Sequence, residues 1–269
     1  MNANVTVDFQ GATPLADWGV IRAAGPDAAS FLQSQLTQDV IGLDAHRATL
    51  AGWCSAKGRL MASFVVCRPA PDELLLACSA DVLPAVLKRL SMFVLRAKCK
   101  LSDASAELTL HGVAGSAASA PVWRRVEGAI GLPPARGVSR ALYVGAAPAL
   151  PALDVNAWSW LEVASGVPRI VAATVEKFVP QMVNLELVGG VDFQKGCYPG
   201  QEVVARSQYR GTLKRRAFVF ETAAEAVPAQ EIFHSADREQ PAGMVANAAS
   251  CNGKHLLLAE VKLAALDGG

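Results

Sequence analysis

The spacing of apolar residues changes repeatedly along this chain, and this alternation limits the possible folds more than any other feature of the sequence. Residues 81–96 keep the three, four and seven spacing of an amphipathic helix. Strand patterns precede this helix at residues 18–23, 47–53, 59–67 and 73–78. A second set follows, with a strand at 107–113, an alanine-rich helix, a strand at 141–145 and a helix at 154–165. Two such sets predict an α+β core made of two similar halves.

After Gly211 the pattern changes to short strands alone, which predicts a small β-barrel at the C-terminus. These strands are expected at residues 216–221, 229–234, 243–249 and 256–263. With 269 residues, the chain is long enough for one large domain or two smaller ones. We therefore expect an α+β region at 1–205, with halves near 1–100 and 101–205, followed by the barrel at 206–269.

Charge and cysteine content argue against several classes of protein. Lys and Arg number 25 and Asp and Glu 24, so the net charge of +1 gives no global argument for binding nucleic acid or membrane. The six cysteines have no C-x-x-C spacing, and no stable metal site is predicted. The N-terminus lacks the pattern of a signal peptide, and no apolar run reaches the roughly 18 residues of a membrane span. We expect a cytoplasmic protein with reduced thiols and no membrane attachment.

Cys197 lies in a turn that favours a reactive thiol. Gly196 and Gly200 flank it together with a proline, and they allow the backbone to turn tightly. A short helix pattern begins at Gln201, and its N-terminus would direct free N–H groups and a partial positive charge toward the thiol. Lys195 adds a full positive charge two residues away. Both effects favour the thiolate, so we predict that Cys197 is the functional thiol and that Lys195 activates it.

The same turn belongs to a longer motif. Residues 193–206 read F-x-K-G-C-Y-x-G-Q-E-x-x-A-R. This stretch resembles the signature of the YgfZ family, folate-binding proteins linked to iron–sulfur cluster maintenance and tRNA modification. That family is related to the aminomethyltransferase of the glycine cleavage system. The resemblance implies a three-part fold that ends in a barrel and surrounds a folate-binding opening, with tetrahydrofolate or a derivative as the cofactor.

The resemblance also implies which residues contact the folate. Trp18 and Trp158 match a tryptophan pair of folate-binding members, and two indoles offer large apolar faces to a flat pteridine. Lys57 and Arg59 would hold the glutamate tail of the folate. The motif adds six cofactor-binding candidates: Gly196, Tyr198, Gly200, Gln201, Glu202 and Arg206. On the residues alone, a core role is favoured for the two tryptophans and a basic turn in solvent for Lys57–Arg59.

Two departures from the transferase pattern concern carboxylates. By register, the acidic pair of the aminomethyltransferases falls on Met61–Ala62, and their glutamate before a conserved turn falls on Ala164. Glu162 lies two residues away, which on a helix is a different face. A transferase needs a carboxylate to orient and protonate the pterin amines. The missing carboxylates argue against aminomethyl transfer, so we do not expect a classical enzyme.

Six basic residues lie between residues 195 and 216 against a single acid, in a chain that is otherwise close to neutral. They form what we call the 195–216 stripe: Lys195, Arg206, Arg210, Lys214, Arg215 and Arg216. A stripe of this kind suits a polyglutamyl tail, tRNA phosphates or simply the solvent, and the sequence leaves these alternatives open.

Together these features predict a YgfZ-like accessory protein that binds reduced folate and supports iron–sulfur clusters in client enzymes, including those that thiolate tRNA. Cys197 would act by transient iron or cluster ligation, by redox exchange, or by protecting a cluster with folate as partner. Because a cluster normally takes four ligands, stable binding needs a second chain or an external thiol. The alternatives are a tetrahydrofolate-dependent one-carbon transferase and a tRNA-binding module that uses the 195–216 stripe.

Overall fold

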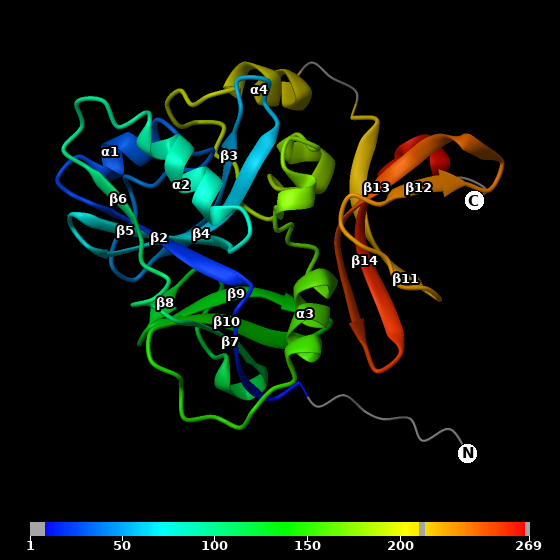
Figure 1. Ribbon diagram of the computed structural model, residues 1–269, viewed down its shortest axis with the longest axis horizontal. Coiled ribbons are helices and arrows are strands. Elements are labelled where there is room, and N and C mark those ends of the chain that lie inside the picture. The colour runs from blue at the N-terminus through cyan, green and yellow to red at the C-terminus, as the bar shows by residue number, and fades with distance from the viewer. Residues whose placement is uncertain (1–8, 210–212, 267–269) are drawn as a thin grey trace.

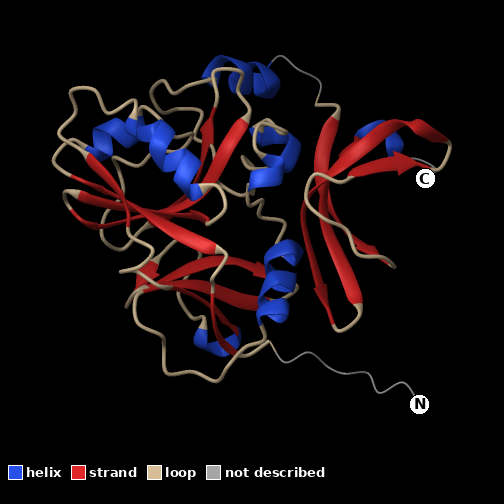
Figure 2. Ribbon diagram, in the orientation of Figure 1, coloured by secondary structure: helices blue, strands red, loops and turns tan. Residues whose placement is uncertain are grey.

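Antiparallel sheets form most of this structure, and its helices are short (Figure 1, Figure 2). The computed structural model describes residues 9–209 and 213–266. Within these residues the α-helices are α1 (Ala28–Gln33), α2 (Leu83–Ser91), α3 (Val155–Ala164) and α4 (Gln201–Tyr209). No helix in the described part of the chain is long and apolar enough to cross a membrane.

The first sheet carries α1 and α2 on one of its faces (Figure 1). Its strand order is β3-β4-β5-β2-β6, and all neighbours are antiparallel. The strands are β2 (Trp18–Ala24), β3 (Ala48–Cys54), β4 (Leu60–Ala70), β5 (Glu73–Ser79) and β6 (Lys100–Asp103). Because side chains alternate between the faces of a strand, Phe64 packs under the helices while its neighbour Val65 joins the main core.

The second sheet has the order β1-β7-β10-β9-β8 and packs against α3. Its strands are β1 (Gly11–Pro14), β7 (Leu110–Ala114), β8 (Arg125–Val126), β9 (Ala129–Ala135) and β10 (Val138–Val144). β1 comes from the start of the chain, yet it pairs with β7 and not with a strand of the first sheet. The division into regions 1–205 and 206–269 stays a prediction.

The third sheet follows α4 and lies beside the other two (Figure 1). Its order is β11-β14-β13-β12, with β11 (Arg215–Thr222), β12 (Glu231–His234), β13 (Asp237–Cys251) and β14 (Lys254–Lys262). β11 and β12 lie at the two edges of this sheet. The four strands agree with the expected strand-rich C-terminus, but the predicted closed barrel is not confirmed.

Two predicted helices differ in the structure. The helix expected at 81–96 ends at Ser91, where the chain enters a series of turns and the Lys98 backbone N–H binds the Asp27 carboxylate at 2.7 Å. In place of the alanine-rich helix, the chain forms one 3-10 turn (Gly115–Ala117) and then β8 and β9. Pairing of β9 with β10 therefore outweighs the helix propensity of alanine in this region.

Candidate functional site

A cavity of about 220 Å³ lies where the two larger sheets and α3 meet the third sheet. The residue before β2, the middle of β4, one face of α3 and β13 all contribute to its wall. Aromatic and aliphatic side chains supply much of the lining, which is typical of a site for a small organic ligand. The polar groups that face it include Asp17, Glu162, Arg140 and Arg169.

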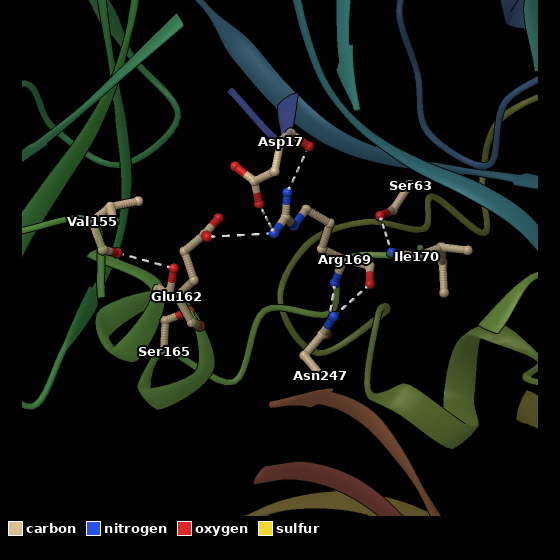
Figure 3. Close-up of polar contacts among 9 residues, drawn as sticks. Asp17, Ser63, Val155, Glu162, Ser165, Arg169, Ile170 and Asn247 are labelled. Atoms are coloured by element: carbon tan, nitrogen blue, oxygen red, sulfur yellow. Dashed lines mark hydrogen bonds and ion pairs between the residues drawn. The ribbon is translucent and has the colours of Figure 1, made fainter. Parts of the chain in front are cut away.

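Arg169 connects the parts of the protein that surround this cavity (Figure 3). Its Nη2 lies 2.5 Å from Asp17 Oδ2 and 3.7 Å from Glu162 Oε2. Its main chain is bound to the third sheet, because the Arg169 N–H donates to Asn247 Oδ1 at 3.0 Å and Asn247 Nδ2 donates to the Arg169 carbonyl at 2.7 Å. The next residue, Ile170, donates its N–H to Ser63 Oγ on β4 at 3.0 Å.

Glu162 and Arg140 bring a half-buried carboxylate and a buried guanidinium to the cavity. Burial raises the pKa of the Glu162 carboxyl, while the positive charges of Arg169 and Arg140 oppose this rise. Arg140 is only 3% exposed, and burial lowers its pKa to about 10. Its Nε and Nη2 both donate to the Pro133 carbonyl, at 3.2 and 3.0 Å. The ion pairs among the described residues do not include Arg140.

The two predicted folate-binding tryptophans lie in different surroundings. Trp18 lines the cavity, with the Arg169 guanidinium 4.9 Å from its ring centroid and its indole N–H buried without a hydrogen-bond partner among the described residues. Trp158 is 1% exposed, packs over Gly112 on β7 and has Arg140 5.5 Å from its ring. Trp123, which the sequence analysis did not single out, lines the cavity. The contact of Trp158 with a ligand stays a prediction.

Cys197 is exposed, unlike most other cysteines of the chain. Lys195 Nζ donates to the Leu36 carbonyl at 2.5 Å and to the Gln33 carbonyl, so its ammonium group holds the end of α1. Burial lowers the pKa of Lys195 to about 8. Tyr198 is 6% exposed, and its ring centroid lies 5.2 Å from Lys195 Nζ. The loop is therefore anchored on both sides of a thiol that faces outward.

Two glycine turns meet beside this loop. Gly200 adopts φ +77°, and a Cβ on it would lie 2.6 Å from the Cα of Gly58, which itself has φ +70°. The turn that contains the exposed Lys57 therefore packs directly on the start of α4. Arg59 Nη1 donates to the Lys177 carbonyl at 2.5 Å. The predicted pair of cations thus lies beside the thiol loop, outside the lining of the cavity.

The 195–216 stripe is not a continuous free surface. Lys195 binds the end of α1, Arg215 pairs with the buried Glu260 at 2.7 Å, and Arg216 pairs with Glu186. Arg210 lies outside the described residues. Arg206 is exposed on α4, in the same helix as the exposed Glu202.

The comparisons with known proteins agree with the motif. No family model matches the chain. A tRNA-modifying protein YgfZ from Edwardsiella ictaluri is 35% identical over 240 residues, which cover 80% of this chain and 72% of that protein. A protein of the same name from Colwellia psychrerythraea is 31% identical over 226 residues, which cover 76% of this chain and 69% of that protein. The chain belongs to the YgfZ family.

A solved structure gives the corresponding fold. The glycine cleavage system aminomethyltransferase T from Bartonella henselae superposes with a TM-score of 0.72 at 14% identity, covering 96% of this chain and 80% of that chain. At such low identity the likeness concerns the fold alone. It confirms that this YgfZ-family chain has an aminomethyltransferase-like fold.

The residues predicted from the YgfZ motif do not gather in one site. Trp18 lines the cavity, whereas Gly196, Tyr198, Gly200, Gln201, Glu202 and Arg206 belong to the thiol loop and α4 and are not part of the lining. β4 connects the two places. The turn of Gly58, just before β4, packs on the thiol loop, while Ser63, Phe64 and Val65 in the middle of β4 line the cavity.

Glu162 and Ala164 lie on different faces of α3, as predicted, but it is Glu162 that lines the cavity. The face of α3 that meets the cavity carries Ser159, Glu162 and Val163, the i, i+3 and i+4 positions of one helical stripe. Ala164 instead packs against the core. The spacing of Glu162 from Ser159 could have placed both residues on one face of the helix. The alignment with the transferases directed attention to Ala164 instead.

We expect Gly200→Ala to lower the free energy of unfolding by roughly 2–4 kcal/mol, because the new Cβ combines a left-handed backbone with a clash against Gly58. Gly253→Ala is the matched control. Its φ is +70°, but nothing lies within 4 Å of its Cβ position, so only the backbone cost of about 1–2 kcal/mol remains. Urea denaturation measures both, and equal losses would contradict the packing of the two turns.

Arg169→Met should lower the free energy of unfolding by about 3 kcal/mol, because it leaves the half-buried Glu162 without its nearest cation. Arg136→Met is the control, since it also removes a link to the third sheet but breaks an exposed pair with Glu221 worth about 0–1 kcal/mol. Chemical denaturation of both variants, monitored by circular dichroism, would measure the two free energies of unfolding. If Arg136→Met proved as damaging as Arg169→Met, the buried network would not be the connection that matters.

Proposed function

We propose that this protein is a folate-binding accessory protein that supports the assembly or repair of iron–sulfur clusters in client enzymes, including those that thiolate tRNA. The observation that carries the folate part is the cavity, which is lined by two indoles, the half-buried Glu162 carboxylate and the buried Arg140 guanidinium. The name tRNA-modifying protein, borne by the relatives, supports the link to tRNA. The aminomethyltransferase-like fold supports folate as the ligand class.

The cavity residues suit the head group of a reduced folate. That group is flat, carries adjacent N–H donors and has a carbonyl oxygen. The Glu162 carboxylate would accept from the donors, the Arg140 guanidinium would donate to the oxygen, and Trp18 would offer its ring face. Tetrahydrofolate would supply a one-carbon carrier or a reduced pterin at this site.

Arg169 has a positioning role in this proposal. Its charge opposes the rise that burial causes in the pKa of Glu162, and so favours the ionised carboxylate at neutral pH. The same guanidinium binds Asp17 and lies over the Trp18 ring, so it orients the carboxylate and the indole together. A change at Arg169 would therefore disturb the ligand site even without contact to the ligand.

Cys197 would serve a partner outside this chain. Its thiol is exposed, and the loop that carries it is not part of the cavity lining. A single cysteine supplies one of the four ligands that a cluster takes, so the partner or an external thiol would supply the others. Within one molecule, folate and thiol are thus proposed to act at separate places.

Glu162 also favours a second candidate function, a tetrahydrofolate-dependent one-carbon transferase. A carboxylate with a raised pKa beside a pterin is suited to proton transfer to the pterin amines. The positions of the transferase acidic pair, Met61–Ala62, still carry no carboxylate. An assay of one-carbon transfer to tetrahydrofolate distinguishes the two: turnover that Glu162→Gln abolishes would support the transferase, and no turnover would support the accessory role.

Tetrahydrofolate should quench the tryptophan fluorescence of the wild type in a saturable manner. We expect Trp18→Ala to lose this binding, and Glu162→Gln to weaken it roughly tenfold, because a half-buried acceptor for the ligand N–H groups is lost. Cys197→Ala is the control and should bind like the wild type. Absence of saturable binding to the wild type would contradict the folate part of the proposal.

In cells that lack their own copy, this chain should restore thiolated nucleosides in tRNA, measured by mass spectrometry. Cys197→Ser should restore much less, because serine removes the thiolate. Cys251→Ser is the matched control, since the Cys251 thiol is buried in the third sheet. Equal restoration by Cys197→Ser and wild type would contradict a role for this thiol.

A further inference from the structure

The segment that follows α2 carries an unusual group of exposed apolar side chains. Leu95 is 85% exposed, Met92 69% and Phe93 46%. Exposed large apolar side chains grouped on one turn are uncommon on a protein surface and mark interaction sites. We call residues 88–100 the 88–100 surface.

These side chains project from an ordered backbone. Phe93 N–H donates to the Leu90 carbonyl at 3.0 Å, and Val94 N–H to the Ser91 carbonyl at 3.2 Å. At the other end, the Asp27 carboxylate accepts from the Lys98 N–H at 2.7 Å. Val94, Ala97 and Cys99 pack inward against the core beneath α2. The backbone of this segment is therefore fixed by hydrogen bonds and by inward packing, and the side chains of Met92, Phe93 and Leu95 are exposed to solvent.

Cations surround these apolar tips, and the segment contains no acid. The five cations are exposed: Lys88, Arg89, Arg96, Lys98 and Lys100. None of them forms an ion pair with another residue in 9–209 or 213–266. By contrast, three cations of the 195–216 stripe are bound to protein groups. Arg206 and Lys214 of that stripe are exposed, so the denser group of exposed cations lies at residues 88–100.

The composition of the 88–100 surface favours RNA over a protein or a membrane. Lysine is depleted at protein–protein interfaces, whereas lysine and arginine together contact phosphates, and an exposed aromatic ring is a stacking surface for an unpaired base. Membrane-surface helices need a free apolar face, but the apolar residues Leu83, Val86 and Leu90 of α2 are buried in the core.

We propose that the 88–100 surface contacts RNA, with its cations on the phosphates and Phe93 stacked on an unpaired base. The five exposed cations of this surface are the evidence for a polyanion as the partner. The choice of RNA over DNA rests on the proposed function. The turn of Lys98 binds the start of α1, and Lys195, two residues from Cys197, binds its other end.

The test is fluorescence anisotropy with a labelled, in vitro transcribed tRNA over a range of salt concentrations. Five phosphate contacts would give a slope of log affinity against log salt of roughly −3.5. Arg96→Gln with Lys98→Gln should make the slope shallower by about 1.4 and weaken binding at least tenfold at low salt. Phe93→Ala should weaken binding roughly tenfold without changing the slope, because stacking releases no counterions.

Arg238→Gln with Lys254→Gln is the matched control, since it removes the same charge from exposed positions of the third sheet and should bind tRNA like the wild type. No tRNA binding at low salt, or the same loss in the control, would overturn the proposal. So would binding to phosphatidylglycerol vesicles, lost with the same substitutions, in place of tRNA binding. Tetrahydrofolate titration of the wild type keeps the two proposals apart: folate binding without tRNA binding overturns only this one.

Discussion

The geometry of the cavity depends on a single arginine whose main chain and side chain bind different parts of the molecule. The guanidinium of Arg169 holds Asp17, at the start of the first sheet, and Glu162, on the helix of the second. Its amide and carbonyl bind Asn247 on the third sheet. The side chain of this residue thus links the first two sheets, and its main chain links them to the third. The cavity lies between the three sheets that Arg169 connects.

A second consequence of this arrangement is the separation of two chemistries along β4. One end of the strand adjoins the turn that packs on Gly200 and the thiol loop, and its middle forms part of the cavity wall. The cavity is suited to a small flat ligand, while the thiol is exposed and suited to a large partner. Any exchange between the two must pass through a partner molecule or through a shift of the strand, since the groups do not touch.

Local patterns were sufficient for the parts of the site that depend on local structure. The thiol loop follows from glycines that allow a tight turn, whereas Trp18 was identified through the family resemblance and not through a local pattern. The ion pairs were not predictable, because Asp17 is 152 residues from Arg169 and Asn247 is 78 residues from it. No periodicity links such positions. Lys195 shows the same limit: its ammonium binds carbonyls at the end of α1, and only the tertiary fold brings them together.

The strand β1 gives the chain an unusual order of assembly during synthesis. Residues 11–14 leave the ribosome first, but they pair with residues 111–114, and Ala12 also donates its N–H to the carbonyl of Pro151. The first sheet can form from residues 18–103 while β1 still waits for its neighbours. At about 5–20 residues per second, this delay is on the order of ten seconds. The nascent protein therefore carries β1 as an unpaired strand throughout that time. The second sheet is complete only when residues 11–14 pair with residues 111–114.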